Sequence, residues 1–122
     1  MKRIVLLTLT FLGLSACAQA SYKNVSVQDL KTAQNTDSLV LDVRTTQEFA
    51  EGHVPGAKLI PVQELEARVS EVPTDKAVFV ICRSGNRSKT ASELLVKTGR
   101  NNISNVEGGT LAWVAAGYPI EK

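Results

Sequence analysis

The sequence contains little cysteine and almost no histidine. Cys17, Cys82 and His53 are the only residues of these two types among 122. A structural zinc site is closed by four such ligands, so the composition excludes a zinc-stabilised fold. Two cysteines form at most one disulfide, which excludes a disulfide-dense scaffold. We therefore expect no metal, and a fold that depends on its apolar core.

An excess of charge of one sign is also missing. The chain has 14 Lys and Arg against 12 Asp and Glu, and two of the basic residues are Lys2 and Arg3. Without these two the counts are equal. Binding to a nucleic acid through its phosphates requires clustered positive charge. We therefore expect no nucleic-acid partner.

The chain has one long hydrophobic run, Ile4–Leu14, directly after Lys2 and Arg3. A membrane-spanning helix needs about 20 apolar residues, so this run is too short to cross a bilayer. A positive start followed by a short apolar core is typical of a signal peptide. The sequence therefore predicts an exported bacterial protein.

Two cleavage sites follow the apolar run. Leu14-Ser15-Ala16-Cys17 resembles the bacterial lipoprotein box, which would remove residues 1–16 and acylate Cys17. Two or more acyl chains anchor a protein stably. The alternative is cleavage after Ala20, where Ala18-Gln19-Ala20 has the small-x-small pattern of ordinary secretion.

The lipoprotein interpretation is favoured, and it predicts a protein anchored to a membrane through Cys17 and facing the periplasm. Because Ala18 and not Asp follows Cys17, the membrane would be the outer one in a Gram-negative cell. Plain secretion would instead give a soluble periplasmic protein. In both cases residues 17–21 are a tether before one domain, 22–122.

Apolar runs alternate with helical patterns along residues 22–122. This alternation predicts an α/β fold with a small parallel sheet covered by helices on both faces. The predicted strands are Tyr22–Val25, Leu39–Val43, Lys58–Ile60, Ala77–Ile81 and Ile103–Val106. The predicted helices are Val27–Gln34, Thr46–Glu51, Val62–Val69, Ser88–Thr98 and about 110–116.

Cys82 lies at the carboxyl end of a predicted parallel strand, where ligand sites of such sheets form. The segment that follows is Cys82-Arg83-Ser84-Gly85-Asn86-Arg87-Ser88. A helix N-terminus and nearby arginines lower the pKa of a thiol from its usual value of about 8.5. Gly85 and Asn86 tolerate positive φ, so the loop can curl its N–H groups inward into an anion-binding nest. A buried structural cysteine would have apolar neighbours instead. We therefore interpret Cys82 as a nucleophilic thiolate.

The loop resembles the active-site loop of the rhodanese (sulfurtransferase) family. The resemblance extends over nearly the whole of residues 22–122 because further motifs of that family occur in order. These are Leu41–Arg44 with Glu48 and Phe49, Gly52–Ala57 with Ile60 and Pro61, and Gly108–Gly109 with Ala112, Trp113 and Gly117–Pro119. The resemblance implies a rhodanese-like fold.

The resemblance also implies a reaction. Cys82 would take sulfane sulfur from thiosulfate or a similar anion, become a persulfide, and pass the sulfur to cyanide, a small thiol or a protein thiol. No metal or organic cofactor is implied. The loop N–H groups from Arg83 to Arg87 would stabilise the charged sulfur. Arg87 would brace the loop, and Arg83 would face the entrance and attract the donor.

Loop length separates this reaction from phosphoryl transfer. Cys82 and Arg87 are five positions apart, a C-x4-R loop, whereas the related phosphatases and arsenate reductases have C-x5-R. The shorter loop suits a single outer sulfur better than a tetrahedral oxyanion. Two alternatives stay open beside thiosulfate sulfurtransfer: a persulfide or redox partner of exported thiol proteins, and a non-catalytic binding module.

Asp42, Arg44 and His53 are further candidates. Asp42 and Arg44 follow a strand at the same sheet edge as Cys82 and could contact substrate, although pairing with each other is the favoured interpretation. Sulfur transfer from thiosulfate needs no proton abstraction once Cys82 is a thiolate. We therefore interpret His53 as structural. Gly108 and Gly109 would allow a close approach of backbones before the last helix.

Overall fold

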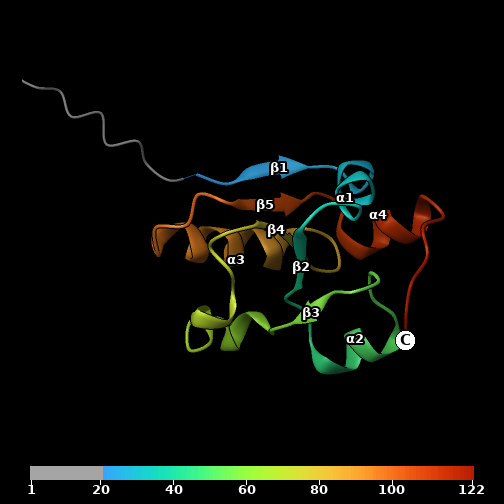
Figure 1. Ribbon diagram of the computed structural model, residues 1–122. Helices are drawn as coiled ribbons and strands as arrows, with labels where there is room; N and C mark the ends of the chain where they lie inside the picture. Colours follow the sequence, from blue (N-terminus) through green and yellow to red (C-terminus); the bar gives the residue numbers. More distant parts are fainter. Residues whose placement is uncertain (1–20) are drawn as a thin grey trace, which may run out of the picture.

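The computed structural model describes residues 21–122 (Figure 1). The predicted signal peptide 1–16, the acylation of Cys17, the alternative cleavage after residue 20 and nearly all of the tether 17–21 lie outside the described residues.

A parallel five-stranded sheet forms the centre of the described region, in the order β1-β5-β4-β2-β3. Every neighbouring pair of strands is parallel, and β1 and β3 form the edges (Figure 1). The strands are β1 Lys23–Val25, β2 Ser38–Asp42, β3 Lys58–Leu59, β4 Ala77–Ile81 and β5 Ile103–Val106. All five predicted strands are confirmed, which confirms the α/β fold class.

Of the four α-helices in the described region, three connect strands and the fourth follows the last strand. They are α1 Val27–Ala33, α2 Thr46–Glu51, α3 Asn86–Lys97 and α4 Gly109–Ala115. The helix predicted at Val62–Val69 is wrong: this segment forms the 3₁₀ turns η1 Val62–Glu64 and η2 Val69–Glu71. Leu65 and Val72 are both buried here, and each follows a valine (Val62 or Val69) by three residues. A spacing of three residues matches the 3₁₀ helix, which has three residues per turn.

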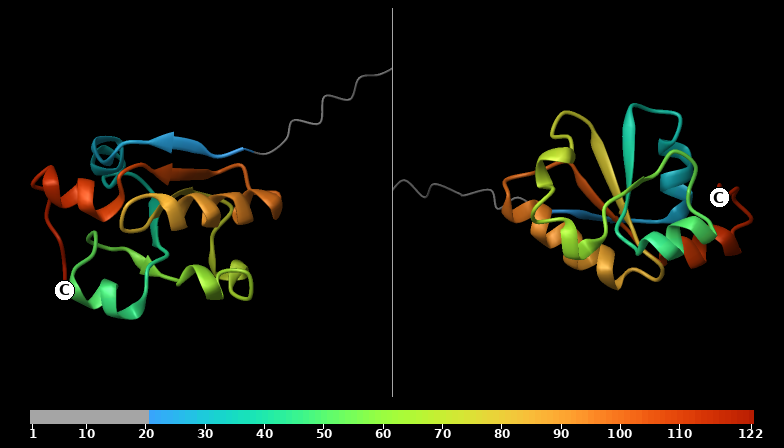
Figure 2. Two further views of the ribbon diagram at one scale, coloured as in Figure 1. Left: turned by 180° about the vertical axis from the view of Figure 1, so that it is seen from behind. Right: turned by 90° about the horizontal axis from the view of Figure 1, so that it is seen from below.

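Alternation along the strands divides the core between the two faces of the sheet. In β4, Val78 and Val80 pack on the face with α3, whereas Phe79 and Ile81 pack with Leu30 of α1 and Trp113 of α4. Successive strand residues point to opposite faces, so continuous apolar runs reflect burial on both sides. The right-hand view of Figure 2 shows α3 on one side of the strands and α1 and α4 on the other.

The C-terminal tail returns to α2. Glu121 pairs with His53 in an antiparallel bridge, and the end of the chain lies beside α2 in Figures 1 and 2. Within residues 21–122, no helix has the length and apolar character needed to span a bilayer.

Candidate active site

Cys82 begins the loop between β4 and α3, and its side chain belongs to the core cluster on the α3 face. The residue is only 1 % exposed. Helix α3 begins at Asn86, two residues before the predicted start, with Gly85 as its N-cap at φ +114°. Asn86 is therefore helical, and of the two loop residues that tolerate positive φ only Gly85 adopts it. Gly85 is thus the one residue of the loop with left-handed backbone, and helix α3 begins directly after it.

The sulfur of Cys82 occupies the position of a helix-capping acceptor. Gly85 donates its backbone N–H to Cys82 Sγ at 3.1 Å, and Ser88 Oγ lies 3.4 Å from the same sulfur. Gly85 has no side chain that could cap the helix, so the free N–H groups of the first turn are left for the sulfur. Ser88 is fully buried, which keeps water from competing with its hydroxyl.

These contacts favour the thiolate. Burial raises the pKa of Cys82, but hydrogen bonds from the Ser88 hydroxyl and from the N–H groups of Ser88, Gly85 and Ser84 outweigh it and bring the pKa below that of an ordinary thiol. The predicted lowering of the thiol pKa by the helix N-terminus therefore corresponds to specific hydrogen-bond donors at the start of α3. The donors come from Ser84, Gly85 and Ser88, not from an arginine side chain.

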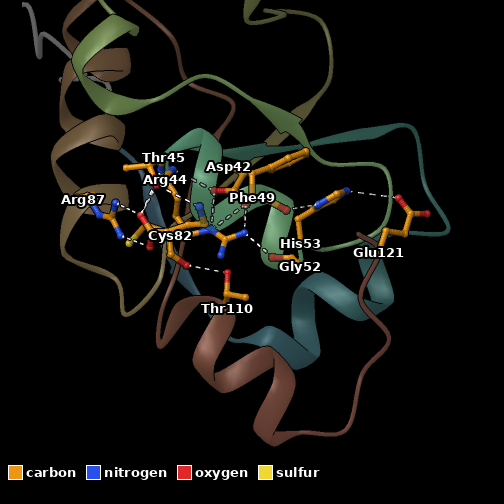
Figure 3. Close-up of polar contacts among 11 residues, drawn as sticks. Asp42, Arg44, Thr45, Phe49, Gly52, His53, Cys82, Arg87, Thr110 and Glu121 are labelled. Carbon is orange, nitrogen blue, oxygen red and sulfur yellow. Dashed lines mark hydrogen bonds and ion pairs between the residues drawn. The ribbon is translucent and has the colours of Figure 1, made fainter.

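Helix α4 holds the outer side of the loop. The N–H and hydroxyl of Thr110 donate to the carbonyl of Cys82 at 2.8 and 3.0 Å, and the Leu111 N–H donates to the carbonyl of Arg83 at 3.1 Å. Figure 3 shows the Thr110 contact. Because α4 donates hydrogen bonds to these carbonyls, the loop can turn its own N–H groups toward the sulfur. Thr110 was not predicted as a site residue.

Arg87 reaches across to α2. Its Nη1 and Nη2 donate to the two carboxylate oxygens of Glu48 at 2.7 and 2.9 Å, a bidentate pair (Figure 3). Glu48 also accepts from the Thr45 N–H and hydroxyl at the start of α2. The hydrogen bonds from Arg87 lower the pKa of Glu48 to about 2, against a smaller opposing effect of burial. This pair ties the end of the Cys82 loop to α2.

We expect Glu48→Gln to reduce stability near neutral pH. A carboxyl whose folded pKa lies below its unfolded value of 4.5 stabilises the fold above pH 4.5 and loses that contribution as the pH falls toward 2. After allowance for solvent screening, the pair is worth about 1 to 2 kcal/mol. The measurement is the free energy of urea unfolding of both proteins at pH 7 and pH 2.5.

The difference between wild type and Glu48→Gln should shrink at pH 2.5, because Glu48 is then partly protonated. Glu71, whose pKa Arg68 also lowers to about 2, titrates in the same range and is unchanged in both proteins. An equal difference at the two pH values would contradict the assignment.

Asp42 and Arg44 form a buried ion pair with each other. Arg44 Nε and Nη2 donate to the Asp42 carboxylate at 2.9 and 2.7 Å, and Nη2 also donates to the carbonyl of Gly52 at 2.8 Å. Asp42 pairs in register with Ile81 and so lies on the sheet face opposite to Cys82. The pair fixes the segment after α2 and, through α2, the position of Glu48.

His53 points away from the sulfur (Figure 3). Its Nδ1 donates to the Phe49 carbonyl at 2.8 Å, its ring stacks on Phe49 at 3.6 Å, and its Nε2 lies 3.7 Å from a Glu121 carboxylate oxygen. These contacts hold the C-terminal tail against α2. Within residues 21–122, the contacts of the ring are with Phe49 and Glu121 and not with the Cys82 loop.

Arg83, Ser84 and Asn86 are exposed around the buried sulfur. Arg83 lines a groove with residues of α4 from Thr110 to Ala115. No three His, Cys, Asp or Glu side chains gather into a cation-binding group in residues 21–122. The site is thus a buried sulfur in a nest of N–H donors, with one arginine braced on α2 and the other in solvent.

The comparisons with known proteins agree with this geometry. The rhodanese-like domain family matches residues 26–116. A sulfurtransferase of Allochromatium vinosum is 39 % identical over 90 residues, which cover 74 % of this chain and 84 % of that protein. Thiosulfate sulfurtransferase 18 of Arabidopsis thaliana is 37 % identical over 112 residues, covering 80 % and 82 %.

A solved structure gives the same result. The crystal structure of a rhodanese-related protein from Thermoplasma volcanium superposes with a TM-score of 0.77 at 37 % identity, covering 82 % of this chain and 98 % of that one. The chain belongs to the rhodanese family of sulfurtransferases.

Two residues of the site, Glu48 and Thr110, were not predicted as site residues from the sequence. Glu48 was noted only as part of a motif, although the capping-box pattern Thr45-x-x-Glu48 gives it a place at the correctly predicted start of α2. Its contact with Arg87 spans 39 positions and has no local signal. Thr110 similarly contacts Cys82 across 28 positions.

Proposed function

We propose that this protein transfers sulfane sulfur from thiosulfate, or a similar anionic donor, to a thiophilic acceptor through a persulfide on Cys82. The observation that carries the proposal is the hydrogen bond from the Gly85 N–H to the Cys82 sulfur, with the Ser88 hydroxyl 3.4 Å from the same sulfur and able to donate to its thiolate form. These donors stabilise negative charge on the sulfur without a general base. The same donors can hold the persulfide.

The reaction has two steps that balance without a cofactor. The Cys82 thiolate attacks the outer sulfur of thiosulfate, the bond between the two thiosulfate sulfurs breaks, and sulfite leaves with its electron pair. An acceptor such as cyanide then attacks the outer sulfur of the persulfide and leaves as thiocyanate. The bond to Cys82 breaks in this step and regenerates the thiolate.

The proposal is tested by incubating the protein with thiosulfate and measuring its intact mass. We expect one added sulfur, which cyanide removes as one equivalent of thiocyanate. A protein that gains no sulfur and yields no thiocyanate would contradict the proposal. Hydrolysis of a phosphate ester at a comparable rate would favour the phosphatase-like alternative.

We expect Arg83→Ala to raise KM for thiosulfate about tenfold while kcat changes less than threefold. Arg83 is exposed beside the loop and, within residues 21–122, forms no ion pair, so its charge is available to a dianionic donor. Steady-state kinetics at low ionic strength measure this, with Lys89→Ala, an exposed cation on α3, as control. A loss confined to kcat would show that Arg83 acts on the transition state instead.

We also propose that the protein is exported and anchored to a membrane through acylated Cys17, with the domain facing the periplasm. The motif Leu14-Ser15-Ala16-Cys17 after an apolar run supports this. Cys17→Ala should move the protein from the membrane fraction to the soluble fraction, measured by immunoblot. An unchanged distribution would favour cleavage after Ala20.

A further inference from the structure

Three large hydrophobic side chains are exposed on the described surface, and all three lie together beside the catalytic loop. Leu111, Val114 and Ile120 are 51, 52 and 41 % exposed. They line one groove of about 350 Å³ with Arg83 and Ala115. We call this surface the Leu111 groove. Exposed apolar side chains gathered in one place, with charged residues around them, mark an interaction surface.

The groove adjoins the loop that carries Cys82. The Leu111 N–H donates to the carbonyl of Arg83, the residue after Cys82, at 3.1 Å. Leu111 and Val114 are three positions apart on α4 and so share a helix face. A molecule lying on this face therefore extends to the loop that holds the sulfur.

Within residues 21–122, some of the charged side chains around the groove are already paired, and others are free to bind an occupant. Arg44 is paired with Asp42, and Glu48 is paired with Arg87. Arg83 and Glu51, in contrast, are exposed and have no ion pair in the described part of the chain, and Arg83 is the one directly next to Cys82 in the loop. An occupant that complements the groove is therefore apolar along its body and carries a negative charge next to Arg83.

We propose that the Leu111 groove docks a protein acceptor whose reactive cysteine is flanked by apolar side chains and by a carboxylate. Cyanide and sulfite are too small to use an apolar surface of this extent. Side chains that are half exposed are covered best by another protein surface, whose core contacts are apolar and aromatic. The inference rests on the proposed function and specifies its acceptor.

The transfer step is a thiol exchange. The acceptor thiolate attacks the outer sulfur of the Cys82 persulfide, a new S–S bond forms on the acceptor, and the S–S bond to Cys82 breaks. Cys82 leaves as the thiolate that its N–H donors stabilise. The proton of the persulfide stays on the outer sulfur, so no oxidant or reductant is consumed.

The test uses three acetylated and amidated peptides as acceptors: Glu-Leu-Cys-Leu-Glu, Glu-Ser-Cys-Ser-Glu and Lys-Leu-Cys-Leu-Lys. The full chain is loaded with thiosulfate, freed of donor and mixed with each peptide at equal thiolate concentration. Mass spectrometry follows sulfur loss from the protein and gain by the peptide. We expect the first peptide to react about tenfold faster than either of the others, since 1.4 kcal/mol of docking energy is tenfold.

Val114→Ser and Ile120→Ser should each remove most of this preference and leave the rate with cyanide unchanged. Val114→Leu and Ala116→Ser, the latter at the C-cap of the same helix but outside the groove lining, should keep it. Equal rates for the three peptides, or a preference that survives both serine variants, would overturn the docking proposal.

Two other occupants have their own signatures. If Val114→Ser turns a dimer into a monomer in light scattering without changing the peptide preference, the groove is an interface between copies of this chain and the proposal is overturned. Loss of binding to anionic phospholipid vesicles, again with an unchanged peptide preference, would overturn it in favour of a membrane contact. Failure of the proposed function is separate, because the protein would then give no thiocyanate with cyanide.

Discussion

Replacing Cys82 with serine should lower the rate of thiocyanate formation from thiosulfate and cyanide at least about a thousandfold. A serine hydroxyl at the same place can accept the Gly85 N–H, so the loop keeps its shape. It does not ionise near neutral pH, however, and it cannot form a persulfide. The measurements are steady-state thiocyanate formation and the mass of the protein after thiosulfate treatment, which should not increase.

The matched variant is Ser88→Ala, which keeps the sulfur and removes one hydrogen bond to it. Because that bond lowers the pKa of Cys82, the variant should retain activity with a pH–rate profile shifted to higher pH. Circular dichroism should show both variants folded. Thiocyanate formation that persists in Cys82→Ser would contradict the assignment of the nucleophile.

Gly109→Ala should disrupt the site although Gly109 has no side chain and contacts no substrate. A Cβ at this position would lie 2.5 Å from the carbonyl oxygens of both Cys82 and Arg83, and Gly109 has φ +58°. Left-handed backbone and a forced shift of packed atoms together cost about 3 kcal/mol or more. Since the atoms in the way are the backbone of the catalytic loop, we expect both a lower midpoint of urea unfolding and a loss of sulfur transfer of about a hundredfold or more.

Gly117→Ala is the control for backbone strain alone. Gly117 has φ +78°, and a Cβ there would meet nothing within 4 Å. Its cost should be about 1 kcal/mol, with activity retained. If Gly109→Ala were as mild as Gly117→Ala, the close packing of α4 on the loop would not be what shapes the site.

The strands were predictable because burial on both faces of the sheet requires a continuous run of apolar residues, which is visible in the local sequence. Residues 77–81 are Ala-Val-Phe-Val-Ile, and such a continuous apolar run in an α/β alternation indicates a central parallel strand. The position of Cys82 at the carboxyl end of that strand follows from the same argument. The start of α3 was not predictable by the usual rule, which looks for a capping side chain of Ser, Thr, Asp or Asn. Here the N-cap is Gly85, and the sulfur of Cys82 accepts its N–H.

From the amino-acid sequence alone come the α/β class, the alternation of elements, the thiol at a strand end and the six-residue loop with two arginines. These depend on neighbours in the chain, where apolar period and backbone preference act. The tertiary structure decided how that loop is held. Arg87 meets Glu48, and the loop carbonyls meet Thr110 and Leu111, only because the parallel sheet brings α2, α3 and α4 to one edge. Contacts between residues 28 to 39 positions apart have no periodic signature, so the bracing of the loop by Glu48, Thr110 and Leu111, and the groove beside it, emerge only in the folded chain.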